Sequence, residues 1–145
     1  MSEPLHVKIQ VDGGSRGNPG PAAAGVVITE AGSGIILHEA GYFLGRATNN
    51  VAEYSALIAG LRAAGRLKAD QVEVLSDSEL MVRQMNGQYR VRNAGLKPLH
   101  DEASELARRM GKFAIAHVSR SQNVKADRLV NMALNAKRNV EDAAD

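Results

Sequence analysis

The first regular pattern in the chain is an alternation of apolar and polar residues over positions 5–12. Apolar side chains occupy every second position, at Leu5, Val7, Ile9 and Val11. A period of two residues is typical of a β-strand with one buried face. Asp12 ends the run on the polar side of the alternation, so we expect its side chain to point away from the core at the carboxyl end of the strand.

Two further runs, 24–29 and 34–43, have the composition of strands. The segment 13–21, which precedes them, is rich in Gly, Asn and Pro and predicts a loop. The link at 31–33 is short, which favours a hairpin between the two runs.

From Asn50 onward the apolar positions recur at the spacing of a helix. The stripe consists of Tyr54, Leu57, Ile58, Leu61 and Ala64. It predicts a helix that ends near Gly65. The remaining predicted elements are a strand at 72–76, helices at 78–85 and 96–110, a strand at 113–118 and a helix at 124–136.

This order of elements predicts an α/β fold with a mixed five-stranded sheet, three antiparallel strands plus two parallel, and helices on both faces. The strands at 5–12 and 72–76 should be parallel neighbours across a helical crossover. Asp12 and Asp77 would then lie at the carboxyl edge of the sheet, where chemistry gathers in such folds. We expect one catalytic domain over residues 1–136 and a polar, frayed tail over 137–145.

Composition narrows the class of protein. The chain has 145 residues, of which 44% are hydrophobic and 3% aromatic, so one core built from Val, Ile, Leu and Ala is expected. A formal net charge of +2 is weak evidence for a polyanionic partner. The absence of Cys excludes disulfides and thiolate zinc sites. The sequence shows neither a signal segment nor an apolar run of membrane-spanning length, so we expect a cytoplasmic protein with no membrane partner.

Four acidic residues are candidates for chemistry, although each has a structural explanation. Asp12 could be a turn residue, and Asp77 could cap a helix. Glu53 could form a reciprocal cap with Asn50, and Asp127 could complement a helix dipole. Together, however, four carboxylates at one sheet edge would repel one another. Divalent cations such as Mg²⁺ stabilise that arrangement, and two of them can catalyse displacement at a phosphodiester.

Four stretches of the sequence carry a family resemblance: Asp12–Pro21, Thr48–Glu53, Ser76–Ser78 and Asn123–Leu129. In this order and spacing they resemble the motifs of type 1 ribonucleases H, over nearly the whole chain. The resemblance implies an endonuclease that hydrolyses the RNA strand of RNA–DNA hybrids by a two-metal-ion mechanism. It implies two Mg²⁺ ions, with Mn²⁺ as a substitute, and the metal ligands Asp12, Glu53, Asp77 and Asp127.

The resemblance also implies a set of residues that bind the hybrid: the backbone near Gly13, with Asn18, Thr48, Asn49 and Asn50. Short amides suit this role because a protein distinguishes RNA from DNA through hydrogen bonds to the 2′-hydroxyl. Turn and cap chemistry is the alternative for the three Asn residues. For Thr48, which would grip a phosphate of the DNA strand, the alternative is a helix-start hydroxyl.

The sequence departs from many family members at two places. It has Glu79 where they have Gln, at a position that contacts a base. The segment 86–96 has only Arg90 and Arg92 in place of a Trp-rich basic protrusion. The chain is therefore similar to compact prokaryotic members without that protrusion or a hybrid-binding domain. We expect a monomer that binds its substrate more weakly, since fewer cations meet the phosphates.

Other functions remain open at this point. The same fold could act on DNA junctions or duplex RNA, or it could be a binding module that has lost its chemistry. The group that handles protons is also open. His117 lies ten residues before Asp127, where some family members carry a mobile His, but the strand pattern at 113–118 should hold it in the sheet. Arg120 is the competing candidate.

Overall fold

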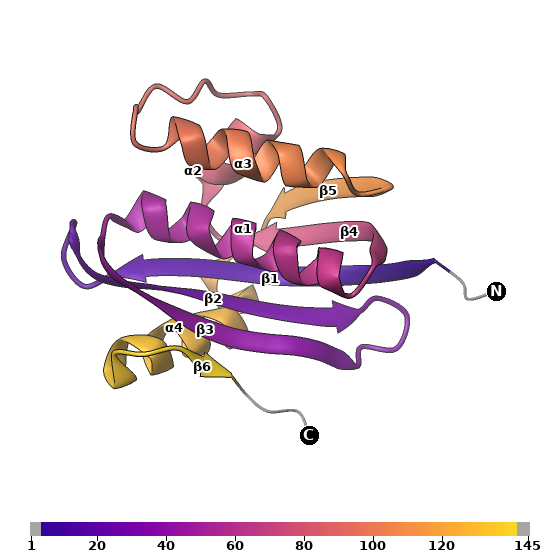
Figure 1. Ribbon diagram of the computed structural model, residues 1–145, viewed down its shortest axis with the longest axis horizontal. Coiled ribbons are helices and arrows are strands. Elements are labelled where there is room, and N and C mark those ends of the chain that lie inside the picture. The colour runs from indigo at the N-terminus through magenta and orange to yellow at the C-terminus, as the bar shows by residue number, and fades with distance from the viewer. Residues whose placement is uncertain (1–3, 142–145) are drawn as a thin grey trace.

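The computed structural model describes residues 4–141, in which a six-stranded sheet is packed against four α-helices (Figure 1). The strands are β1 (Leu5–Ser15), β2 (Gly20–Glu30), β3 (Ile36–Ala47), β4 (Ala69–Ser76), β5 (Lys112–His117) and β6 (Val140–Glu141). The helices are α1 (Asn49–Arg66), α2 (Glu79–Met85), α3 (Lys97–Arg108) and α4 (Val124–Ala136), with a 3₁₀ turn at Arg120–Gln122 before α4. No helix within the described range is both long and apolar enough to cross a bilayer.

The sheet has the strand order β5-β4-β1-β2-β3-β6, so β1 lies near its centre. β1 pairs antiparallel with β2 and parallel with β4, while β4 pairs parallel with β5. The β2–β3 hairpin predicted from the sequence is confirmed, as is the parallel pairing of the first strand with the strand that ends at Ser76. The carboxyl ends of β1 and β4 therefore meet at one edge of the sheet.

Helices cover both faces of the sheet, as expected. In Figure 1, α1 and α3 lie over the near face and α4 lies behind β2 and β3. The larger hydrophobic cluster fills the space between the sheet and α1, with fully buried Ile9, Tyr54 and Leu57 among its largest side chains. Burial of such side chains stabilises the fold by roughly 1.5–3 kcal/mol each.

Glycines let α4 approach the opposite face closely. A Cβ atom at Gly25 in β2 would lie 2.2 Å from the carbonyl oxygen of Ala126, and one at Gly41 in β3 would lie 2.4 Å from that of Leu129. Both distances are far shorter than a van der Waals contact. The main chain of α4 therefore rests directly on the two strands.

Two predictions about the sheet are wrong in detail. The sheet has a sixth strand, because residues 140 and 141 pair with Gly41 and Ala40 at the edge of β3. These two residues lie in the segment expected to fray; positions 142–145 lie outside the described residues.

The loop predicted at 13–21 is shorter than expected. β1 runs on through Ser15 and β2 starts at Gly20, because residues 13–15 pair in register with the small residues 24–22 of β2.

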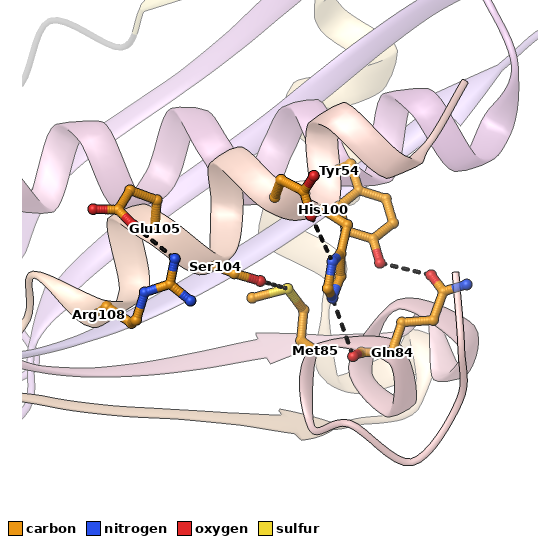
Figure 2. Close-up of polar contacts among 8 residues, drawn as sticks. Tyr54, Gln84, Met85, His100, Ser104, Glu105 and Arg108 are labelled. Carbon is orange, nitrogen blue, oxygen red and sulfur yellow. Dashed lines mark hydrogen bonds and ion pairs between the residues drawn. The ribbon is translucent and has the colours of Figure 1, made fainter. Parts of the chain in front are cut away.

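A buried polar contact joins the helices on the near face (Figure 2). The Tyr54 hydroxyl of α1 donates to Oε1 of Gln84 in α2 at 2.6 Å. Nε2 of His100 in α3 lies 3.3 Å from the main-chain oxygen of Gln84, and its ring meets Tyr54 edge-on. Burial raises the pKa of Tyr54 to about 12. This contact holds the start of α1 against the helix that follows β4.

Candidate active site

A cleft of about 470 Å³ opens at the carboxyl edge of β1 and β4. Its lining includes the four acids singled out in the sequence: Asp12, Glu53, Asp77 and Asp127. They come from four different elements or their ends, namely β1, α1, the residue after β4, and α4. The fold thus brings together side chains that are up to 115 residues apart in the chain.

Three of the structural explanations for these acids do not hold. Asp12 is inside β1, opposite Gly25 of β2, and is not a turn residue. The N-cap of α2 is Ser78, whose hydroxyl accepts from the amide of Met81, so Asp77 is not the cap. The cap of α1 is Thr48, and hence the proposed reciprocal cap between Asn50 and Glu53 is absent. Only Asp127 occupies its expected structural place, in the first turn of α4.

The acids form a compact cluster. Asp12, Glu53 and Asp77 each offer a carboxylate oxygen, and these oxygens lie within 4.8 Å of one another. Asp12 and Glu53 are only 7% exposed. Asp127 is exposed at the rim of the same cleft. A set of oxygen donors of this kind suits hard divalent cations, which take carboxylates and keep several waters.

The electrostatics of the cluster are unfavourable without a cation. Burial, followed by the charges of Glu53, Asp77 and Asp127, raises the pKa of Asp12 to about 9. Burial also raises the pKa of Glu53 to about 7, although a hydrogen bond from the Gly13 amide opposes this shift. Carboxyl groups with raised pKa values in a cleft are typical of functional sites, and a bound divalent cation reverses the shift by favouring the charged forms.

Gly13 makes the contact between β1 and α1 possible. A Cβ atom at this position would lie 2.2 Å from the carbonyl carbon of Ala52 and 2.3 Å from the amide nitrogen of Glu53. The Gly13 N–H donates directly to the Glu53 carboxylate. The absence of a side chain therefore places Glu53 beside Asp12.

A buried amide holds α4 in position relative to β1. Asn123 is fully buried just before α4, and its Nδ2 donates to the carbonyl oxygen of Val11 at 2.8 Å. The next residue in β1 is Asp12, and Asp127 lies four residues after Asn123. This single bond therefore links the segments that carry two of the acids. Sequence reasoning placed Asn123 in a family motif but did not assign it this role.

The loop between β1 and β2 is tied to the start of α1. Oδ1 of Asn49 accepts from the amide of Ser15 at 2.8 Å, and Oδ1 of Asn18 accepts from the amide of Asn49 at 3.1 Å. Turn and cap chemistry is thus part of what Asn18 and Asn49 do. Within residues 4–141, neither Nδ2 group has a hydrogen-bond partner, so both are available as donors. Asn50 lines the cleft beside them.

The two candidates for proton handling lie in different places. His117 is the last residue of β5 and pairs with Ser76, as the strand prediction required. Arg120, in the 3₁₀ turn, lines the cleft, whereas His117 does not. The cleft also includes Arg16 and Asn131, which sequence reasoning missed. A lone Arg in a Gly-rich loop and an Asn on a helix give no periodic signal that would have identified them.

Comparison with known proteins agrees with this geometry. A family model described as reverse transcriptase-like matches residues 10–133. The chain is 46% identical over 123 residues to ribonuclease HI of Halobacterium salinarum, covering 85% of this chain and 61% of that protein. It is 46% identical over 132 residues to a bifunctional protein of Mycobacterium tuberculosis, covering 91% of this chain and 36% of that protein. The chain thus spans only part of the length of these relatives.

Solved structures show the same fold. The crystal structure of ribonuclease H1 from Halobacterium salinarum superposes with a TM-score of 0.87 at 44% identity, covering 90% of this chain and 98% of that one. A ribonuclease H1 isolated from compost, solved in complex with an RNA/DNA hybrid, gives a TM-score of 0.85 at 42% identity, covering 90% and 98%. The fold and the acid cluster define a ribonuclease H-like domain. More specifically, the chain belongs to the type 1 ribonuclease H family.

Proposed function

We propose that this protein is a metal-dependent endonuclease that hydrolyses the RNA strand of RNA–DNA hybrids. The observation that carries the proposal is the group of three carboxylates within 4.8 Å of one another, with Asp127 at the rim of the same cleft. The family membership supports the substrate class, and one relative has been solved with an RNA/DNA hybrid.

The four acids would hold two Mg²⁺ ions, or Mn²⁺ in their place. Asp12 and Glu53 form the buried floor of the site, while Asp77 and the exposed Asp127 complete it. The chemistry that two such ions would supply is activation of a water as the nucleophile and stabilisation of the leaving oxygen of the phosphodiester. A hydrogen bond from the Gly13 amide holds the Glu53 carboxylate beside those of Asp12 and Asp77.

Hydrogen-bond donors beside the cluster suit a minor groove. Asn18 and Asn49 use their amide oxygens internally and present their Nδ2 groups as donors. The minor groove offers acceptors at base edges, and RNA adds 2′-hydroxyls that both donate and accept. With Asn50 and the backbone near Gly13, these groups would read the strand that lies over the carboxylates.

Phosphate contacts would complete the binding surface. The Thr48 oxygen accepts from the Val51 amide at 3.2 Å, which leaves the hydroxyl hydrogen to donate to a phosphate of the DNA strand. Thr48 thus serves both as a helix cap and as a proposed ligand. Arg120 lies in the cleft, where its guanidinium would meet a phosphate near the cleaved bond.

Cleavage assays on defined substrates test the proposal. Labelled RNA–DNA hybrid, duplex RNA, duplex DNA and single strands are incubated with the protein, with and without Mg²⁺ or Mn²⁺. We expect metal-dependent cleavage of the RNA strand of the hybrid, and its loss in Asp12→Asn and Asp77→Asn. Asp101→Asn, at a side chain that is 70% exposed on α3, is the matched control and should retain activity. Cleavage without metal, or near-normal turnover in either active-site variant, would contradict the proposal.

A further inference from the structure

The cleft does not end at the carboxylates but continues along α4. Asp127, Val130, Asn131 and Leu134 all line it, and they span most of the length of that helix. Asp127, Asn131 and Asn135 are spaced four residues apart, so they share one face of α4. A polar stripe therefore leads from the proposed metal site toward the carboxyl end of the helix.

Hydrogen bonds connect Asn131 with Asp127 and Asn135 with Arg16. Nδ2 of Asn131 donates to the main-chain oxygen of Asp127 at 3.1 Å and lies 3.5 Å from its Oδ2. Asn135 contacts the β1–β2 loop, since its Oδ1 accepts from Nη2 of Arg16 at 2.7 Å. Arg16 lines the same cleft. The stripe thus begins at a carboxylate and ends at a guanidinium.

Arg16 is held in place but is not neutralised. Its amide donates to the carbonyl oxygen of Pro21 at 2.8 Å, and the preceding residue, Ser15, is bound to Asn49, so the main chain on this side of the loop is fixed. No carboxylate in the described part of the chain forms an ion pair with Arg16. The amide oxygen of Asn135 occupies one of the five N–H donors of a guanidinium and leaves its charge intact. The remaining donors can form charge-assisted bonds to an anion.

We propose that Arg16 binds a phosphate of the cleaved strand and that Asn135 is its positioning residue. Asn131, which lies between Asp127 and Asn135 on α4, would be a further polar contact to the same strand. The inference rests on the proposed function. An RNA strand bound over the carboxylates would continue along α4 into the part of the cleft that Arg16 lines. From Asp127 to Asn135 is about 12 Å along the helix. The phosphate bound by Arg16 would therefore lie a few nucleotides from the cleaved bond.

The first test compares matched variants in steady-state cleavage of a hybrid. Arg16→Ala should raise KM about tenfold with kcat changed by less than about twofold, because a charge-assisted bond outside the reacting centre is lost. Arg16→Lys should recover part of that loss, and Asn135→Asp should raise KM by pairing the guanidinium internally. Arg109→Ala removes the same charge just after α3, where Arg109 is 68% exposed and lines a separate groove with Ala69 at the start of β4, and it should change KM by less than about twofold.

The second test identifies the phosphate itself. Hybrids are prepared with one neutral methylphosphonate at each position of the RNA strand around the cleaved bond. For the wild-type protein, one position a few nucleotides away should raise KM about tenfold, and Arg16→Ala should be insensitive at that position alone. An unchanged KM in Arg16→Ala, or equal sensitivity of both proteins at every position, would overturn the subsite while leaving cleavage intact. Absence of any cleavage by the wild-type protein would overturn the proposed function and the subsite together.

Discussion

Replacing Asp12 with Asn should make the metal-free protein more stable at neutral pH, although the change lies at the centre of the cleft. Burial and the three neighbouring acids raise the pKa of Asp12 from 3.8 to about 9. At pH 7 the folded protein therefore keeps a proton that the unfolded chain has released. Because folding takes up this proton, the free energy of unfolding falls as the pH rises between the two pKa values. Asn has the size of the neutral carboxyl group and does not titrate.

The size of this stability difference follows from the same pKa values of Asp12. From a pKa of 3.8 to pH 7 is about three units, and each unit corresponds to 1.36 kcal/mol, so the ceiling is about 4 kcal/mol. The four acids share protons, and the site relaxes when one of them is neutral. We therefore expect Asp12→Asn to be more stable than the wild type by about 2 kcal/mol at pH 7. The difference should vanish near pH 3.5, where Asp12 is largely protonated in both states.

Urea unfolding followed by circular dichroism, in the presence of a chelator, measures this difference across pH. Asp101→Asn is the control, because a substitution at this exposed side chain should change the free energy of unfolding by less than about 0.5 kcal/mol. Adding Mg²⁺ should stabilise the wild-type protein more than Asp12→Asn, since only the former keeps all four ligands. If Asp12→Asn were the less stable protein at pH 7, or if the difference did not change with pH, the buried repulsion inferred from the cluster would be wrong.

Three further outcomes are expected. Single-turnover cleavage should fall by less than about tenfold in His117→Ala, below the range of a general base, and by more in Arg120→Ala, because only Arg120 lines the cleft; the opposite order would return the role to the histidine. Gly13→Ala should destabilise the protein by about 2–3 kcal/mol, as judged by thermal melting, because its Cβ would overlap the Ala52 main chain. Asn49→Ala should weaken hybrid binding by about 1–3 kcal/mol and lower stability by about 1 kcal/mol; a stability loss with unchanged affinity would leave only the structural role.

Much of the fold could be predicted because its elements carry clear periodicity. The helix at 124–136 was predicted with the bounds observed for α4, and the alternation up to Asp12 placed this acid correctly at the carboxyl edge. The resemblance to a known family then supplied the four acids, all of which line one cleft. The assignment of a catalytic domain to residues 1–136, a monomeric state and a cytoplasmic location stay predictions.

The remaining features depend on contacts between segments distant in sequence. The alternation put Asp12 on the side away from the core, yet it is almost fully buried, because other segments close over that side of β1. The sixth strand consists of two residues, which pair only because the edge of β3 is available to them. Arg16 acquires its place in the cleft from Asn135, which is 119 residues away. None of these contacts leaves a local pattern in the sequence.

The two glycines beneath α4 restrict how this sequence can change. Because the main chain of the helix rests on Gly25 and Gly41, even a methyl group at either position would lift α4 and carry Asp127 away from the other acids. Selection on activity would therefore act on these positions as strictly as on the acids themselves, although neither glycine touches the chemistry. In a library randomised at both positions, clones selected for cleavage should keep glycine at both. Clones selected only for soluble expression should accept Ala or Ser as well.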